Sequence, residues 1–460
     1  MIEERIKLNS EQEKALKKIT NWFHRETESP EQQILTLRGA AGTGKTTLAQ
    51  YAVELLRQAN QGLEIVGAAP THNAVGVLKE KSGLECRTIH SVLGLKLVWR
   101  ESQQKLERGD RSPLLPNLII LDEAGMVDSE LHDKLLESIA GTNCKVLAMG
   151  DECQVPPVNE SHSLLFDSPN QIALTKVMRQ NESPMKRFIE WAREYARNPR
   201  KGPFNPQISH RSTDFPANSA VAVAQSEPIK MALRYLRSGE FESNPDCYRI
   251  ICYRNKTQQH INQLIRRLWL KERGIRNPQQ LMAGEWIKTE KPIIRRSNGM
   301  EKIIAPTGYQ MQIQNVKESK QAGFQCFGVS ANITDINGAE TKETFYVLLE
   351  GEEERYQREV GKLLAIAKKF NSSKQRGMHW SNYYDLLQQF AEVDFCFAGN
   401  VHDTQGRTLK SAAIIGEDLA TRLALRDNNP LRKIWEYNRL WYTAVSRVST
   451  GGMLAYTRIG

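Results

Sequence analysis

The chain contains 460 residues, a length that allows roughly two to four domains, each large enough for its own hydrophobic core. Its 63 basic residues exceed its 53 acidic residues, and the charge of +10 favours a polyanionic partner without proving one. We expect no membrane association, because no apolar run reaches the ~18 to 20 residues of a membrane span and the polar start does not resemble a signal peptide. The seven cysteines form no CxxC pair, which indicates reduced thiols in a cytoplasmic protein and argues against disulfides or a zinc site.

The first predicted element is a helix that begins near Ser10. Ser10 and Glu13 have the spacing of a capping box, which satisfies free N–H groups at a helix start. Gln12 lies in the first turn of this helix, so helix initiation is one interpretation of this polar cluster.

The next element is a glycine-rich loop at 39–47, GAAGTGKTT, between an apolar run at 34–37 and a helix-compatible stretch. This context is typical of a P-loop, in which glycines let backbone N–H groups face phosphate oxygens at a helix N-terminus. Lys45 can reach the β- and γ-phosphates, and the Thr46 hydroxyl can bind Mg²⁺. The alternative is a glycine-rich turn after a strand. We expect an ATP site that includes Gly42, Thr43, Gly44, Lys45, Thr46 and Thr47, with Mg²⁺ as cofactor.

Apolar runs alternate with helical patterns through 1–185, which predicts a parallel sheet covered by helices. A polar and charged excursion at 96–117 interrupts the pattern as an insertion. A second α/β unit is expected at 186–285 and 395–460, with a helix at about 257–270. The predicted strands of the two units are 34–37, 64–69, 118–121, 146–149, 172–174, 248–253, 395–398 and 412–415.

The remaining segment, 286–394, does not continue this alternation of apolar runs and helical patterns. Hairpin-like alternation at 300–350, with a turn signal at Asn337 and Gly338, predicts a small β-barrel. Residues 352–392 look helical, with an interruption at 370–382. The simplest organisation is two α/β domains that each contain an insertion.

Asp122 and Glu123 end the predicted strand at 118–121. One carboxylate there can hold Mg²⁺ and its neighbour can activate a water for attack on the γ-phosphate. Such pairs are also common in turns and at helix starts, but their position downstream of a P-loop favours the functional interpretation.

Gln154 follows the next strand, just before Pro156 and Pro157. Its carboxamide can donate and accept, so it can orient a water or sense the terminal phosphate; the alternative is an ordinary loop residue. Arg179 follows the strand after that, and Arg447 lies near the end of an amphipathic helix. Either arginine can stabilise charge on a transferred phosphoryl group, although a single arginine is usually a surface charge.

Eight motifs occur in an order that resembles superfamily 1 DNA helicases of the RecD-like and Dda-like group, and most closely the Dda-like phage helicases. The resemblance covers essentially the whole chain. The motifs are the P-loop, APTHNA at 69–74, TIH at 88–90, DEAGM at 122–126, GDECQVPP at 150–157, LTKVMRQ at 174–180, VHDTQGRT at 401–408 and WYTAVSR at 441–447.

The resemblance implies two RecA-like domains, a pin-like insertion at 96–117, and an SH3-like barrel with a helical extension at 286–394. It also implies a monomeric, ATP-dependent helicase that moves 5′→3′ on single-stranded DNA and acts at junctions with duplex. Gln12 is then expected to read adenine, Asp122 to support the metal and Glu123 to act as the base. The residues expected to close around the γ-phosphate are Gln154, Arg179, Gln405 and Arg447.

The same resemblance implies a set of residues along the path of the single strand. They are Thr71, His72, His90, Asn255, His402 and Thr408. For His72 and His90 the alternative is a loop histidine satisfied by backbone groups. Trp99, the only aromatic residue of 96–117, is either a strand-separating wedge or a packing residue.

Two other functions remain open at this point. An RNA-directed superfamily 1 helicase shares these motifs, since the residues that select the sugar are not evident. A P-loop switch that binds nucleic acid without unwinding is disfavoured by a second domain with its own arginine. No pattern names a protein partner, and a replication or single-strand-binding protein is kept as a candidate.

Overall fold

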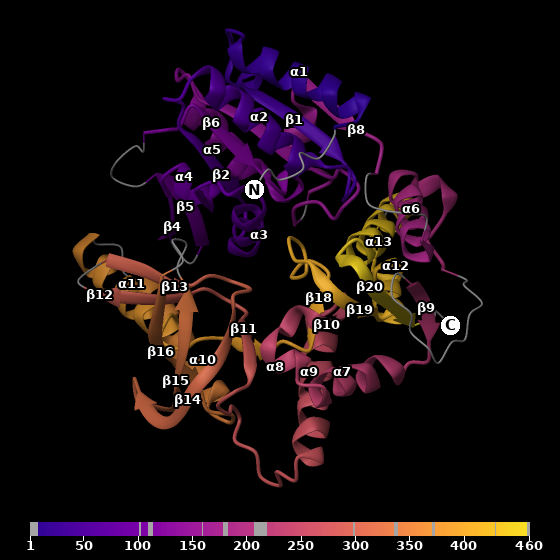
Figure 1. Cartoon of the computed structure of the whole chain (residues 1–460). Helices are drawn as coiled ribbons and strands as arrows, with labels where there is room; N and C mark the ends of the chain where they lie inside the picture. The colour runs from indigo at the N-terminus through magenta and orange to yellow at the C-terminus, as the bar shows by residue number, and fades with distance from the viewer. Residues whose placement is uncertain are drawn as a thin grey trace.

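The computed structural model describes residues 8–100, 103–108, 114–158, 160–177, 183–206, 219–297, 300–334, 339–369, 373–427 and 429–457. Two α/β units with parallel sheets and one unit with an antiparallel sheet make up this part of the chain (Figure 1). The α/β fold class predicted from the sequence is thereby confirmed.

The first domain is built on a parallel sheet of order β3-β2-β6-β7-β1-β8. Apolar side chains from both faces of the sheet are buried beneath helices, which explains why its inner strands are apolar throughout. Its strands are β1 (Ile34–Gly39), β2 (Ile65–Ala69), β3 (Cys86–Thr88), β6 (Leu118–Leu121), β7 (Lys145–Gly150) and β8 (Asn170–Leu174). Its helices are α1 (Ser10–His24), α2 (Lys45–Ala59), α3 (His72–Ser82), α4 (Ile89–Val92) and α5 (Ser129–Ile139).

An antiparallel hairpin of β4 (Leu95–Arg100) and β5 (Gln103–Arg108) projects from this domain, within the predicted excursion (Figure 1). The backbone of Trp99 pairs with that of Gln104 in this hairpin. The Trp99 side chain lies outside the described part of the chain.

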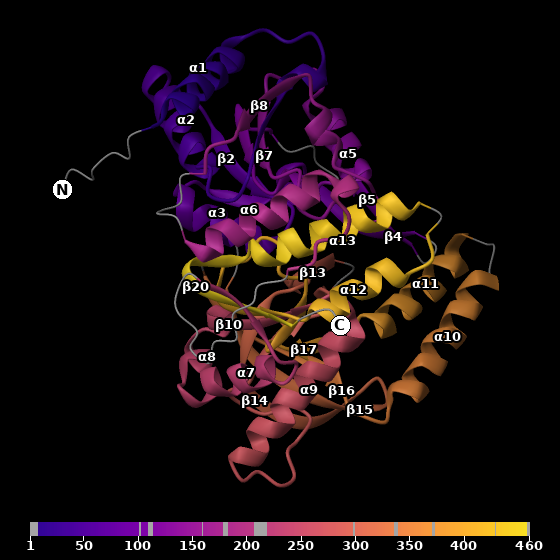
Figure 2. The ribbon, with the colours of Figure 1, turned by 90° about the vertical axis from the view of Figure 1, so that its right-hand side faces the viewer.

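The second domain has a parallel sheet of order β18-β10-β19-β20-β9. Figure 2 shows α6 and α13 side by side along the boundary with the first domain. The strands are β9 (Ser219–Val223), β10 (Tyr248–Cys252), β18 (Ala398–Asn400), β19 (Leu409–Ile414) and β20 (Val448–Thr457). The helices are α6 (Pro184–Arg197), α7 (Glu227–Arg237), α8 (Glu240–Ser243), α9 (Asn255–Glu272), α12 (Gly416–Ala424) and α13 (Pro430–Val445).

The inserted unit contains an antiparallel sheet of order β16-β15-β14-β11-β17 and a separate hairpin of β12 and β13. Helices α10 and α11 pack together beside this sheet (Figure 1). Its strands are β11 (Trp286–Thr289), β12 (Ile293–Ser297), β13 (Met300–Ala305), β14 (Gln310–Gln321), β15 (Phe324–Thr334), β16 (Glu340–Leu348) and β17 (Val393–Phe395). The helices are α10 (Glu353–Lys369) and α11 (Ser373–Leu387).

One hydrophobic core is shared by the second domain and the antiparallel sheet. Ile250 of β10 and Ile261 of α9 belong to the same buried cluster as Ile287 of β11 and Met311 of β14. Burial of this apolar surface attaches the inserted unit to the second domain as one body.

Three local predictions were wrong. The run at 395–398 is not one strand, because Phe395 pairs with Ile287 in the antiparallel sheet and Ala398 pairs with Ile250 in the parallel sheet. Both halves lie in the shared core, so the apolar run hides the break between β17 and β18. The interruption expected at 370–382 is helical from Ser373 onward, because packing of α11 against α10 overrides weak helix propensity.

The third error concerns the start of α1. The N-cap is Asn9, whose side chain accepts the N–H groups of Glu11 and Gln12 at 2.9 Å each. Gln12 closes the capping box by accepting the Asn9 N–H at 3.0 Å, so Ser10 and Glu13 do not form it.

In the two parallel sheets, strands β3, β9 and β20 were not predicted from the sequence.

All seven cysteines are buried and unpaired, in agreement with the expectation of reduced thiols. Among the helices of the described residues, none has the length and apolar character needed to cross a membrane.

Candidate nucleotide-binding and catalytic site

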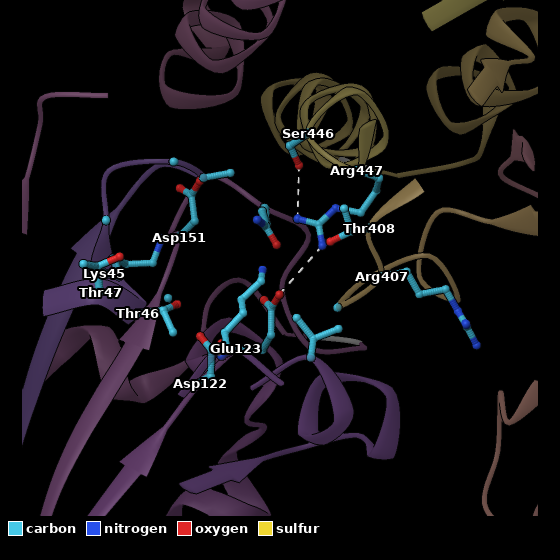
Figure 3. Close-up of a pocket in the computed structure, with 18 of the residues that line it drawn as sticks. Lys45, Thr46, Thr47, Asp122, Glu123, Asp151, Arg407, Thr408, Ser446 and Arg447 are labelled. Carbon is cyan, nitrogen blue, oxygen red and sulfur yellow. Dashed lines mark hydrogen bonds and ion pairs between the residues drawn. The ribbon is translucent and has the colours of Figure 1, made fainter. Parts of the chain in front are cut away.

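A cavity of about 500 Å³ lies between the two α/β domains (Figure 3). It forms where β1, β6 and β7 end side by side, the edge at which parallel sheets usually bind ligands. The first domain contributes Gln12, Gly42, Gly44, Lys45, Thr46, Thr47, Asp122, Glu123, Asp151 and Gln154 to its lining, and the second contributes Gly406, Arg407, Thr408, Ser446 and Arg447.

The loop after β1 has the backbone of a phosphate cradle. Gly42 and Gly44 both have φ of +84°, a conformation that strains residues with a side chain, and Gly44 is the N-cap of α2. A Cβ on Gly44 would lie 2.5 Å from Nε2 of Gln12, so a larger residue would displace that amide in addition to straining the backbone. Gln12 donates in turn to the Thr43 carbonyl at 3.2 Å. The first free N–H groups of α2 therefore face the cavity next to the Gln12 amide.

Lys45 lies inside this loop. Its Nζ donates to the carbonyls of Gly39 at 2.7 Å and Ala40 at 3.1 Å. Burial lowers the pKa of Lys45, while the nearby carboxylates of Asp151 and Asp122 oppose that shift. The amine is held among anionic groups at the place where a phosphate chain would enter.

Asp122 and Glu123 follow β6 into the cavity. The Asp122 N–H continues the strand by donating to Ala68, and its Oδ1 accepts the Glu123 N–H at 2.9 Å. Glu123 has φ of +53°, which costs a non-glycine residue about 1–3 kcal/mol and is concentrated at functional sites. Burial raises the pKa of Glu123 and the Arg447 cation opposes the shift. A carboxylate with a raised pKa suits a general base.

Arg447 reaches the cavity from the end of α13 in the second domain. Its Nη1 lies 3.7 Å from Oε1 of Glu123, and its Nη2 donates to the Ser446 hydroxyl at 3.2 Å (Figure 3). The side chain is 6% exposed, and within the described chain its buried Nε has no hydrogen-bond partner. A donor without a partner inside an anion-binding cavity is suited to an incoming phosphate.

Gln154 and Gln405 lie on opposite sides of the domain boundary. Gln154 is buried at the cavity wall, and its carbonyl accepts from Arg439 of α13 at 3.0 Å. Gln405 is also buried and donates to the Val155 carbonyl at 3.3 Å. Both glutamines thus lie in direct contacts between the two domains.

Sequence reasoning missed Asp151, a buried carboxylate that also joins the domains. It accepts the Tyr442 hydroxyl of α13 and lies 3.5 Å from Nη2 of Arg193 of α6. Its position in the motif GDECQVPP, directly after β7, was the available signal. Because Tyr442 and Arg193 both come from the second domain, Asp151 links the cavity wall to α6 and α13.

The residues that were predicted to lie along the path of the single-stranded nucleic acid form two groups. In the first domain, Thr71 caps α3 by accepting the Ala74 N–H at 3.3 Å, with His72 next to it and His90 in α4. Burial lowers the pKa of both histidines; the His90 ring lowers that of His72 further, and Asp128 opposes the shift of the His90 pKa without outweighing it. These rings are therefore neutral near pH 7.

In the second domain, Asn255 begins α9 and accepts from the Asn400 amide at 2.8 Å. His402 is exposed in the turn that follows β18. Thr408, also expected on the strand path, lines the nucleotide cavity. Arg179 lies outside the described residues.

The donors at this site suit Mg²⁺. Thr46 and Asp122 both line the cavity, and hydroxyl and carboxylate oxygens are ligands that Mg²⁺ prefers. The described residues contain no cluster of three or more His, Cys, Asp or Glu side chains that could hold a metal.

Comparison with known proteins adds independent information. Residues 7–202 match the family model for an AAA domain. The chain is 26% identical over 411 residues to the ATP-dependent DNA helicase dda of Enterobacteria phage T4, covering 83% of this chain and 87% of that protein. It is 32% identical over 150 residues to the ATP-dependent RecD2 DNA helicase of Deinococcus radiodurans, covering 32% of this chain and 20% of that protein.

Among solved structures, a Pif1 helicase from Bacteroides in complex with ADP-AlF3 and ssDNA aligns with 98% of this chain and 92% of that chain. The TM-score is 0.47 and the sequence identity is 16%. The sequence matches confirm the resemblance that the eight ordered motifs indicated.

Proposed function

Because the chain is related to the superfamily 1 DNA helicases of the RecD-like and Dda-like group, we propose that it is an ATP-dependent DNA helicase. We propose further that it moves 5′→3′ on single-stranded DNA and unwinds duplex DNA ahead of it. The observation that carries the proposal is the cavity between the domains, where Arg447 of one domain lies 3.7 Å from Glu123 of the other.

ATP binds with its phosphates on the P-loop and Lys45, and with its base near Gln12. The γ-phosphate then lies between Glu123, which takes a proton from the attacking water, and Arg447, which stabilises the charge that develops on the transferred group. Gln154 and Gln405 lie close enough to the domain boundary to respond to that phosphate. Thr46 and Asp122 would hold Mg²⁺, which would supply positive charge beside the phosphate oxygens.

The cycle produces movement because the nucleotide binds two domains at once. ATP favours the closed cavity by contacting Lys45 and Arg447 together, and loss of the γ-phosphate removes that preference. Single-stranded DNA that lies across Thr71 and His72 on one domain and Asn255 and His402 on the other is then gripped by each in turn. Contacts of this kind act on the backbone and tolerate any base sequence.

The described lining of the cavity contains both the P-loop and Arg447 of the same polypeptide, which supports action as a monomer. The basic net charge of +10 is consistent with a nucleic-acid ligand.

Unwinding of matched duplexes with a 5′ or a 3′ single-stranded tail tests the proposal. We expect the 5′-tailed substrate alone to be unwound, only with ATP, and Glu123→Gln to bind the same substrate without unwinding it. Unwinding of the 3′-tailed substrate would contradict the polarity. Equal unwinding of a substrate with an RNA tail would contradict the preference for DNA. ATP hydrolysis that is stimulated by DNA but is not accompanied by unwinding would instead favour a nucleic-acid-binding switch.

A further inference from the structure

A buried lysine joins the inserted unit to the second domain. Lys288 of β11 is 3% exposed, and its Nζ lies 2.5 Å from Oδ2 of Asp403 and 3.0 Å from Oε1 of Glu290. A lysine is almost never buried to this extent unless it is paired. Burial opposes the charge on Lys288, but the two carboxylates outweigh it and raise the pKa of Lys288, so this buried lysine keeps its charge.

Asp403 belongs to the turn that contains motif VHDTQGRT. Its N–H donates to Oδ1 of Asn400 at 2.8 Å, and the turn continues with the Gln405 N–H donating to the His402 carbonyl at 3.1 Å. The next residues, Gly406 and Thr408, line the nucleotide cavity. Lys288 therefore contacts this turn only a few residues from the cavity wall.

The surrounding polar groups leave the turn little freedom. Gln258 of α9 accepts the Asn400 N–H at 2.9 Å and donates to Glu290 at 3.1 Å and to Asp394 at 3.0 Å. Glu290 follows β11 and Asp394 lies in β17, so both carboxylates belong to the inserted unit. The hydrogen bonds thus run from the antiparallel sheet through α9 into the turn.

Arg407 adds a second connection between the turn and the inserted unit. Its side chain points away from Lys45 and Glu123 (Figure 3) and contacts the Gly308 carbonyl and Asp246. The Gly308 carbonyl also accepts from Asn73 of the first domain at 3.2 Å. The inserted unit therefore touches both sides of the domain boundary at this turn.

We propose that Lys288 is a positioning residue, which holds the turn at 401–408 through Asp403 so that Gly406 and Thr408 keep their places in the lining of the nucleotide cavity, where they face the terminal phosphate of ATP. The inserted unit is then part of the hydrolytic site and not only a neighbouring surface. The inference rests on the proposed ATPase function. Its consequence is that ATP turnover depends on a side chain that touches neither nucleotide nor DNA.

The test compares Lys288→Met with Arg266→Met. Arg266 of α9 makes a similar ion pair with Glu285, at 2.6 Å, directly before β11 where the chain enters the inserted unit, but this pair does not contact the turn. Arg266→Met therefore controls for the general effect of losing a partly buried ion pair near this junction. The measurements are the kcat of ATP hydrolysis with saturating single-stranded DNA, the affinity for ADP, and the melting temperature.

We expect Lys288→Met to lower kcat about 10-fold and to leave ADP affinity within about 2-fold, because ADP lacks the terminal phosphate that the turn faces. Lys288→Arg, which keeps the charge, should recover most of the loss. Arg266→Met should keep kcat within about 2-fold, whatever its melting temperature.

Equal kcat in Lys288→Met and the parent protein would overturn the inference, as would a matching loss of ADP affinity or an equal loss of kcat in Arg266→Met. If Lys288→Met does not fold, Asp403→Asn weakens the same pair from the more exposed side, and an unchanged kcat in that variant would overturn the inference. A parent protein without ATPase activity would instead contradict the proposed function itself.

Discussion

The two α/β domains differ in what lies at the N-terminus of one helix in each, α2 in the first domain and α9 in the second. In the first domain, the N-terminus of α2 opens into a cavity through Gly42 and Gly44, with no side chain capping it. In the second domain, the Asp418 carboxylate lies beside the start of α9, where it accepts the N–H groups of Tyr253 and Arg254 at 2.7 and 2.9 Å and the hydroxyl of Thr257 at 2.6 Å.

The same physical preference underlies both arrangements. Helix N-termini attract anions, and the second domain places its own carboxylate at such a position while the first leaves it open to the cavity. The first domain thus contributes the helix start at Gly44, and the second contributes Arg447 and residues of the turn at 401–408 to the same cavity. Similar folds become unequal halves of one site through a few loop residues.

The largest expected effect comes from removing the lysine of the P-loop in the first domain. Lys45→Ala should lower ATP hydrolysis at least about 10³-fold, because it removes the cation that the P-loop holds beside the phosphates. Binding of single-stranded DNA, measured by fluorescence anisotropy, should stay largely intact. Full unwinding by this variant would contradict the proposed motor.

Removing the arginine that the second domain contributes to the cavity should have a somewhat smaller effect. Arg447→Ala should lower kcat about 10³-fold by removing the cation that stabilises the transferred group, with ADP affinity nearly unchanged. Arg447→Lys should recover little, because a lysine cannot reproduce the planar, forked donor. Stopped-flow binding of a fluorescent ADP beside steady-state hydrolysis separates the two quantities, and a parallel loss of ADP binding would argue against this role.

The smallest effect is expected at Asp418, whose carboxylate accepts hydrogen bonds from other residues of the second domain. Asp418→Asn should lower the free energy of unfolding by about 2 kcal/mol, since it weakens hydrogen bonds to a buried carboxylate. The KM for ATP should not change. Urea denaturation and steady-state kinetics provide the two readouts, and a large rise in KM would show that this helix start also serves the nucleotide.

The same substitution has a predictable pH dependence. Burial opposes the charge on Asp418, but hydrogen bonds from Thr257, Arg254 and Tyr253 outweigh it and lower its pKa. A lowered carboxylate pKa contributes stability that is present above the unfolded value of about 3.9 and is lost as the pH falls through the folded value. The stability difference between the parent protein and Asp418→Asn should therefore be largest near neutral pH and shrink in acid; a difference independent of pH would contradict this origin.

Local sequence was most informative where a backbone conformation or a strand end requires particular residues. The glycine-rich loop at 39–47 and the two carboxylates after 118–121 were predicted at strand ends, and the structure places them there beside one cavity, because each depends only on its own strand and loop. The prediction failed where one apolar run serves two sheets, as between Phe395 and Ala398, because burial makes both halves look alike. It also missed Asp151 and Lys288, whose partners lie 291 and 115 residues away in the chain.

By itself, the sequence determined the α/β class of this protein, its glycine-rich loop after β1 and its resemblance to superfamily 1 helicases, because these depend on short-range patterns of residues. Only the tertiary structure decided which side chains meet across the cavity. Arg447 faces Glu123, Tyr442 binds Asp151 and Lys288 binds Asp403 because folding encloses their charged and polar groups between packed domains. Removing such groups from water makes a partner necessary, and no local pattern names that partner in advance.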